Sequence, residues 1–207
     1  MWVQREEGAD LTSLLLAASL PQGLLIPVLG IMTAANEWSQ RTALITFSQE
    51  PRRLRVMAAK TVAALVLGLG VLVLSVLLAM LGHLASATLA DGGEVDLSLG
   101  WPLVVGLVVA QVLGVVMGVA FGALFLNVPL AIVAFFLIPS LMPLVFSLTS
   151  WLREHAAWLD LATAQAPLLE ERWLTSTQWA QLGTTSAIWV LLPLVVGLWR
   201  VSRREVK

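Results

Sequence analysis

The sequence predicts an all-α, polytopic membrane protein with five transmembrane helices. Two observations predict this class. The chain is 58% hydrophobic and only 12% charged, whereas soluble domains average about 25% charged residues. In addition, long stretches of the 207 residues contain no Asp, Glu, Lys or Arg, and each is at least as long as the roughly 20 residues that a helix needs to cross a bilayer. These uncharged stretches are 11–36, 61–90, 97–152 and 173–199.

The boundaries of the predicted helices follow from charges, turn residues and tract length. The tract 97–152 is too long for one crossing at about 1.5 Å per residue. Asn127 and Pro129 in FLNVP predict a turn that divides it. We assign all five helices to a single transmembrane domain, residues 1–207. The predicted spans are 11–35, 61–86, 101–125, 129–149 and 181–199, with a cytoplasmic connecting segment at 37–60 and an outer segment at 150–180.

The distribution of Lys and Arg predicts the orientation, because cytoplasmic loops are enriched in positive charge. Nine of the twelve Lys and Arg fall in two regions, 41–60 and 200–207. The other predicted loops carry acidic residues instead. We therefore expect a multi-pass protein of the bacterial cytoplasmic (plasma) membrane, with its N-terminus outside and its C-terminus in the cytoplasm. The acidic residues of the outer loops are Asp91, Glu94, Asp96, Glu154, Asp160, Glu170 and Glu171.

The segment 37–60 has a pattern beyond its charge. Leu44, Ile45 and Phe47 lie among polar neighbours, which is typical of a short helix on the membrane interface. Pro51 then favours a new helix start, because proline fits the first turn, where its missing N–H has no partner. We expect a short helix, a break, and a long helix that continues into the second span. A charged anchor that only fixes orientation is the alternative.

In order and spacing, the motifs E-W-S-Q-R-T, P-R-R and K of this segment resemble those of type-2 ABC exporter permeases. The resemblance covers nearly the whole chain, including the turn FLNVP and the ending WVLLPLVVGLWRVSRREVK. It implies that 37–60 contacts a separate ABC ATPase subunit, which binds ATP and Mg, and that a second permease chain completes a homo- or heterodimer. The matching positions are Glu37, Thr42, Pro51, Arg53 and Lys60; Arg41 and Arg52 complete the expected coupling site.

The sequence departs from this family in two respects. Type-2 permeases usually have six helices and a cytoplasmic N-terminus, so the first helix is the one expected to be missing here. A truncated gene product, an incorrect start site and a true five-helix variant all fit that pattern. The turn FLNVP also lacks the basic residue that relatives often carry.

A stripe of small residues, one at every fourth position, runs along the third predicted span. Small side chains let two helix backbones approach closely, which matters in lipid because lipid provides no hydrophobic drive for helix association. The stripe predicts packing on another helix of the same chain. A contact between subunits or a pore-lining ridge is the alternative. Its residues are Gly106, Ala110, Gly114, Gly118 and Gly122.

The outer segment 150–180 alternates apolar and charged residues at roughly helical spacing. Trp151, Leu152, Trp158 and Leu159 predict an amphipathic helix on the outer interface. Such helices are common before the last span of type-2 permeases. A loop that rests on the membrane without a gating role is the alternative.

The predicted spans offer little chemistry for catalysis, since they contain no charged residue and the chain has no cysteine. No G-x(4)-G-K-[ST] loop is present to bind nucleotide, and His83 and His155 lack metal-ligand spacing. We expect no enzyme activity, metal, cofactor or nucleic-acid partner. The expected function is the permease subunit of an ATP-driven exporter for a hydrophobic or amphipathic substrate. A non-transporting membrane scaffold or immunity-type protein, including a truncated permease, is the alternative.

Overall fold

The computed structural model describes residues 10–89 and 97–204, which are helical apart from short connections and include no strand. Five helices within this part are long and apolar enough to cross a membrane, which confirms the predicted all-α membrane fold. The acidic loop residues 91–96, Glu205 and Lys207 lie outside the described residues. The five candidate spans are Leu11–Ser39, Arg53–Ser86, Trp101–Phe125, Val128–Ser147 and Ser176–Arg203.

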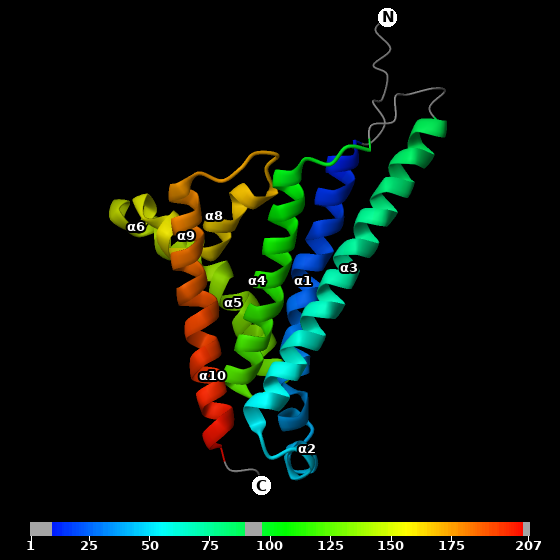
Figure 1. Ribbon diagram of the computed structural model, residues 1–207. Helices are drawn as coiled ribbons and strands as arrows, with labels where there is room; N and C mark the ends of the chain where they lie inside the picture. The colour runs from blue at the N-terminus through cyan, green and yellow to red at the C-terminus, as the bar shows by residue number, and fades with distance from the viewer. Residues whose placement is uncertain (1–9, 90–96, 205–207) are drawn as a thin grey trace, which may run out of the picture.

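Helix α4 lies at the centre of the bundle (Figure 1). It contacts α1, α3, α5, η1 and α10, and α1 also contacts α3. The elements are α1 (Leu11–Ser39), α2 (Ala43–Gln49), α3 (Arg53–Leu89), α4 (Trp101–Phe125), α5 (Val128–Ser147), α6 (Ser150–Glu154), α7 (Ala156–Leu159), α8 (Leu161–Gln165), the 3-10 helix η1 (Ala166–Leu169), α9 (Ser176–Ser186), the π-helical η2 (Ala187–Leu191) and α10 (Leu192–Arg203).

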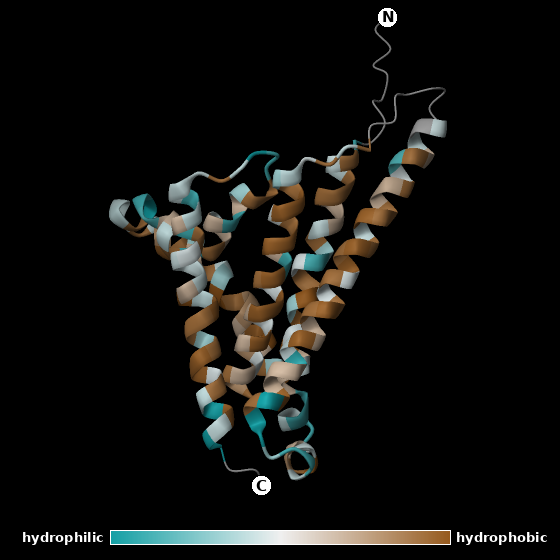
Figure 2. Cartoon of the chain, in the orientation of Figure 1, coloured by the Kyte–Doolittle hydropathy of each residue, from teal (hydrophilic) through white to brown (hydrophobic). Residues whose placement is uncertain are grey.

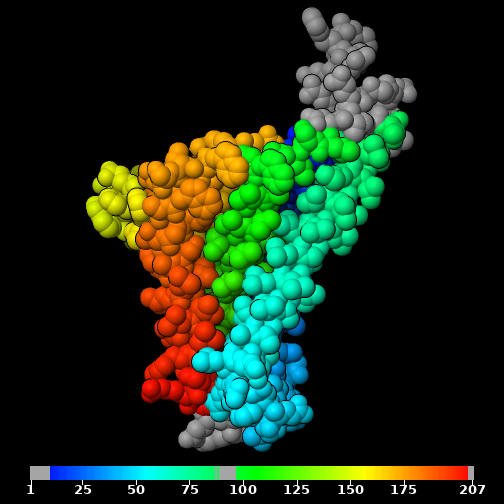
Figure 3. Space-filling view, in the orientation of Figure 1, coloured from blue at the N-terminus to red at the C-terminus, as the bar shows by residue number. Residues whose placement is uncertain are grey.

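The surface of the bundle is apolar along the long helices and polar mainly toward its two ends (Figure 2). Within the most apolar 18-residue stretch of each helix, only 22% of the residues of α3 and 11% of those of α5 are buried inside the chain. Because exposed apolar side chains of this extent are unfavourable in water, these faces fit a lipid environment or another apolar chain. In the space-filling view, α4 is seen between α9–α10 and α3 (Figure 3).

The contact between α1 and α4 is a backbone contact. A Cβ added to Gly118 would overlap the carbonyl oxygen of Pro27, and one added to Gly30 would lie 2.7 Å from the carbonyl oxygen of Val115. Both helices therefore contribute a glycine to the same crossing. The absence of side chains there allows the dispersion contacts that hold helices together in lipid.

The small-residue stripe of α4 contacts two other elements of the same chain. A Cβ on Gly106 would overlap the carbonyl group of Leu168 in η1, and one on Gly122 would lie 2.7 Å from the carbonyl oxygen of Ile31 in α1. A Cβ added to Gly114 would lie 3.6 Å from the ring of Pro27. Along its length the stripe thus contacts α1 and η1, while Ala110 lines a hollow described below.

The turn between α4 and α5 has the local geometry that FLNVP predicts. Leu126 ends α4 with a φ of 52°, in the left-handed region. The side chain of Asn127 then accepts a hydrogen bond from the backbone N–H of Leu130 at 2.9 Å and so caps α5. Pro129 follows in the first turn of α5, where a missing N–H costs nothing.

The last span is longer than predicted and contains a π-helical turn. It begins at Ser176 after a capping box between Thr175 and Gln178, whereas the predicted span begins near 181. The wide turn η2 comes just before Pro193. Proline lacks an N–H and its ring would clash with the carbonyl four residues earlier, and a π turn is one way in which a helix accommodates such a break.

The outer segment is helical, as predicted, and consists of the short helices α6, α7, α8 and η1. Thr149 and Asp160 each accept a backbone N–H bond from the residue three positions on, and each starts a new helix. Leu161 is 8% exposed and Leu168 is fully buried. The indole N–H of Trp189 also donates to the carbonyl oxygen of Leu159 at 2.7 Å. The segment is therefore partly built into the bundle.

Adding one methyl group at the α1–α4 crossing should destabilise the fold. In Gly118→Ala, the new Cβ would overlap the backbone of Pro27, and backbone atoms cannot move aside as a flexible side chain can. We expect the free energy of unfolding to fall by about 1–3 kcal/mol, which is typical of overpacking. The measurement is the temperature at which the detergent-solubilised protein no longer elutes as a single species, and this temperature should be lower for the variant.

Gly70→Ala is the matched control, because a Cβ there meets nothing within 4 Å. It should leave the transition temperature unchanged or raise it slightly, since Ala favours the helix. Equal transition temperatures for the two variants would show that the α1–α4 crossing is not a tight contact.

Candidate functional site at the basic end of the bundle

One end of the bundle carries all the described Lys and Arg except Arg153 and Arg172. It consists of the last turn of α1, α2, the first turns of α3 and the end of α10 (Figures 1 and 2). We call residues 36–60 and 199–204 the basic end. Every residue of the expected coupling site lies within it.

Glu37 and Lys60 form an ion pair between the end of α1 and the second turn of α3. Their side chains are only 22% and 18% exposed, respectively. A half-buried pair is screened less by water and salt than a surface pair. The pair borders a polar hollow of about 410 Å³, which is lined by Met32, Thr33, Asn36, Glu37, Gln40, Thr42 and Lys60.

The chain leaves α1 through a tight turn at Arg41, whose φ of 60° is in the left-handed region. The N–H of Thr42 donates to the carbonyl oxygen of Glu37 at 2.8 Å, which satisfies a carbonyl at the helix end. The hydroxyl of Ser39 accepts from the N–H of Val128 at 2.8 Å and joins this turn to the start of α5. The turn that leads into α2 is therefore held by α1 and by the start of α5.

Helix α2 has a covered side and an open side. Ala43 is buried, and the ring of Phe47 lies 5.8 Å from that of Trp38 on α1. Leu44 and Ile45 are instead 59% and 62% exposed. The two adjacent large apolar side chains thus project from the tip of an otherwise charged end.

The break between α2 and α3 is organised by Glu50. Its carboxylate accepts the backbone N–H of Arg52 at 3.1 Å and lies 3.6 Å from the guanidinium of Arg55. Pro51 and Arg52 are exposed and α3 begins at Arg53. The predicted sequence of short helix, break and long helix is present in the structure.

Arg53 ties three elements together. Its guanidinium donates to the carbonyl oxygens of Val201, at 2.9 Å, and of Arg204, and it lies 5.2 Å from the centre of the Phe47 ring on α2. The last carbonyls of a helix lack intrahelical partners and carry partial negative charge, so a cation at the end of α10 is favourable. Arg200 similarly donates to the carbonyl oxygen of Leu124 at the end of α4, at 2.7 Å.

The expected coupling residues divide into two groups in the structure. Glu37, Lys60 and Arg53 make contacts within the chain and are only partly exposed, whereas an ATPase contact predicts that Glu37 and the arginines are presented to the cytoplasm. Arg41, Pro51 and Arg52 are exposed and available to a partner, and Thr42 is half-buried. The predicted coupling site does not include five further residues that make contacts at this end, namely Trp38, Phe47, Glu50, Arg200 and Arg204. The nearest signal for them is the spacing of Trp38 and Phe47 on either side of the turn.

Comparisons with protein-family models, with curated protein sequences and with solved structures find no significant match for this chain. In the described part of the chain, no group of three or more His, Cys, Asp or Glu is placed to hold a metal ion. The functional interpretation therefore rests on the motifs quoted above and on the geometry of the basic end.

Removing one partner of the Glu37–Lys60 pair should cost more stability than removing both. Each of Glu37→Ala and Lys60→Ala leaves a half-buried charge unpaired, whereas the double variant does not. In a double-mutant cycle of thermal unfolding in detergent, we expect a coupling energy of about 0.5–3 kcal/mol.

The Glu50–Arg55 pair is the internal control, because its side chains are 37% and 67% exposed. Exposed pairs are worth at most about 1 kcal/mol, so Glu50→Ala and Arg55→Ala should be nearly additive. A coupling energy for Glu37–Lys60 no greater than that of the control would contradict the structural role of the buried pair.

Proposed function

We propose that this chain is the transmembrane subunit of an ATP-driven exporter and that its basic end is the attachment site for a separate ATPase. The observation that carries the proposal is α2, a seven-residue helix that is held between two spans and presents Leu44 and Ile45 outward. A membrane protein that uses this end only to fix its orientation has no need for a rigid, braced helix with an exposed apolar tip.

The basic end has the connections that a force-transmitting element needs. Helix α3 continues without interruption from Arg53 into the second span, and its 37 residues correspond to roughly 55 Å at 1.5 Å per residue. Its first turn is bound to α10 through Arg53 and to α2 through the Phe47 ring. A displacement of α2 would therefore move α3 and α10 together.

The exposed surface of this end defines the partner that would fit it. Two exposed apolar side chains, Leu44 and Ile45, lie in the same connection as the exposed cations Arg41 and Arg52. Protein interfaces typically combine a buried apolar centre with a polar rim, and arginine is enriched in them. The complementary surface is an apolar groove with acidic residues at its edge, on a subunit that also binds ATP and Mg. Lipid or a second permease chain would cover the apolar faces of α3 and α5.

The first test concerns orientation, because a cytoplasmic ATPase can reach the basic end only from the cytoplasm. The chain has no cysteine, so single cysteines report position directly. In intact cells a membrane-impermeant maleimide should label Thr177→Cys, at the start of α9, and should fail to label Ser48→Cys, in α2, until the membrane is opened. Labelling of Ser48→Cys in intact cells would overturn the proposal.

The second test concerns the attachment itself. The tagged full-length chain, purified from its native membrane, should carry an ATPase with a nucleotide-binding loop and measurable ATP turnover. Ile45→Glu and Arg52→Glu should each reduce the amount of bound ATPase about tenfold or more, as expected for central interface residues.

Arg153→Glu is the matched control for Arg52→Glu, since both arginines are exposed but Arg153 lies on α6, away from the basic end. It should retain the ATPase. If Arg52→Glu and Ile45→Glu bind as much ATPase as Arg153→Glu, α2 is not the attachment site. If the well-folded chain carries no ATPase at all, the non-transporting scaffold is the better description.

A further inference from the structure

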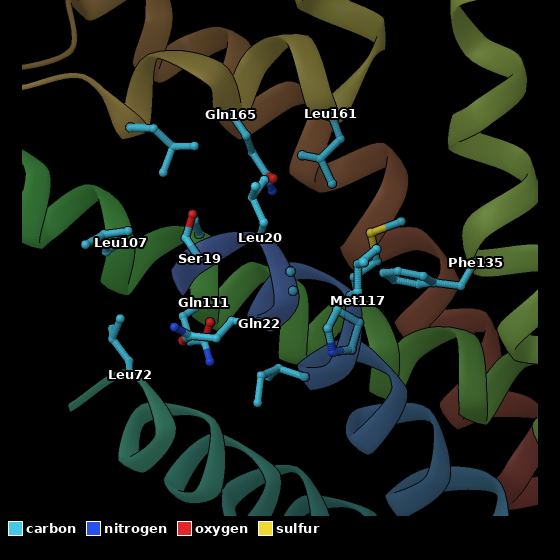
Figure 4. A pocket seen from close by; sticks show the side chains of 17 residues that line it. Ser19, Leu20, Gln22, Leu72, Leu107, Gln111, Met117, Phe135, Leu161 and Gln165 are labelled. Atoms are coloured by element: carbon cyan, nitrogen blue, oxygen red, sulfur yellow. The ribbon is translucent and has the colours of Figure 1, made fainter. Parts of the chain in front are cut away.

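A hollow of about 350 Å³ lies in the middle of the bundle between α1, α3, α4, α5, α8 and η1 (Figure 4). A second hollow of about 250 Å³ adjoins it and shares several of its lining residues, including Leu24, Met117 and Phe135. Most of the lining is apolar, but Ser19, Gln22, Gln111 and Gln165 contribute polar groups. We call the two hollows together the amide groove.

Gln22 lies near mid-span, and its amide has an unused acceptor. Its Nε2 donates to the carbonyl oxygen of Ala18 at 3.0 Å and to the hydroxyl of Ser75 at 2.9 Å. Its Oε1 is buried and has no hydrogen-bond partner. A buried acceptor without a partner is unfavourable and requires an explanation. A bound molecule with an O–H or N–H group would satisfy it.

Most other polar groups of the groove are backbone carbonyls and uncharged side-chain amides and hydroxyls. Pro27 and Pro139 have no N–H to donate to the carbonyls of Gly23 and Phe135, four residues earlier, and both of those residues line the groove. One of the two N–H groups of the Gln111 amide is used, since Nε2 donates to the carbonyl oxygen of Gly68 at 2.8 Å. Gln165 adds an amide that can both donate and accept, so the polar part of the groove suits a hydroxyl group, which also does both.

The charges around the groove exclude an anionic head group. None of the residues that line either hollow is Lys, Arg or His. The one ionisable residue is Asp160, 8% exposed, whose carboxylate accepts from the backbone N–H and the hydroxyl of Thr163 at 2.9 and 2.5 Å. A negative group placed here would meet another carboxylate and no compensating cation.

The groove opens toward the surface that faces lipid. Leu20 and Leu24 line it and are 72% and 56% exposed. Both lie in α1, between the ends of the first candidate span. A ligand would therefore enter sideways from the bilayer and would need an apolar body to be dissolved there.

We propose that the amide groove binds an uncharged single-chain amphiphile whose head group carries hydroxyl donors. The head is placed at Gln22 and the chain lies along the apolar walls formed by Met117, Phe135 and Leu161. As a binding site the groove is independent of the basic end; only the further step, that the bound amphiphile is also the transported substrate, rests on the proposed function.

The test uses the purified full-length chain in nanodiscs, without any ATPase, and hexadecanol carrying a photoactivatable diazirine in its chain. After irradiation, the cross-linked sites should concentrate in residues 19–27, 107–117 and 161–169. Unlabelled hexadecanol should compete for this labelling at lower concentration than ionised hexadecanoic acid, which has a negative head. Equal competition, or labelling spread evenly over the exposed face of α3, would overturn the proposal.

Two variants test the site by different means. Gln22→Leu removes the acceptor and should weaken hexadecanol competition by roughly threefold to tenfold, the change expected for one hydrogen bond. Leu24→Trp should fill the mouth of the groove and abolish most of the labelling, even if Gln22→Leu does not fold.

Gln181→Leu and Leu67→Trp are the matched controls, because neither residue lines the groove. Both should be labelled like the unaltered chain. Unchanged labelling of Leu24→Trp would overturn the proposal and would leave the attachment of an ATPase to α2 untouched, since no ATPase is present in the experiment.

Discussion

The structure depends first on the backbone contact between α1 and α4. In lipid, apolar side chains gain nothing by leaving solvent, so helices associate through close contact and hydrogen bonds. Gly118 and Gly30 provide that contact by bringing each helix directly against the backbone of the other. Since α4 also contacts α3, α5, η1 and α10, the position of nearly every other element is defined relative to this crossing.

Polar side chains within the bundle form directional hydrogen bonds between helices. Dispersion contacts alone would let the helices slide or rotate against one another. Gln111 of α4 donates to a backbone carbonyl of α3, and Gln22 of α1 donates to Ser75 of α3. An amide in hydrocarbon must find a partner because water is absent. These bonds therefore fix the rotation and register of the three helices, as small-residue packing alone does not.

The sequence predicts the fold well and the site only in part, for physical reasons. Helix length and charge segregation are properties of single segments, so the spans, the turn at Asn127 and the helix start after Pro51 can be predicted. The direction in which a charged side chain turns depends on what lies beside it. Arg53 could not be assigned to the end of α10 because the two segments meet only in the folded chain. The outer segment is helical as predicted, but its division into short helices could not be predicted, because hydrophobic periodicity does not reveal the caps at Thr149 and Asp160.

The basic end and the amide groove are joined by the same two helices. Glu37 of α1 pairs with Lys60 of α3 at the basic end, and Gln22 bonds Ser75 in the groove. On each helix these residues are fifteen positions apart, or roughly 22 Å at 1.5 Å per residue. The two antiparallel helices are thus joined by two side-chain contacts, and the same number of residues separates the contacts on each helix. If α3 slides along α1 at the basic end, the Gln22–Ser75 hydrogen bond must also break, because a helix transmits an axial shift over such a distance. Gln22 also lines the amide groove, so the register of α1 against α3 shapes one wall of that groove.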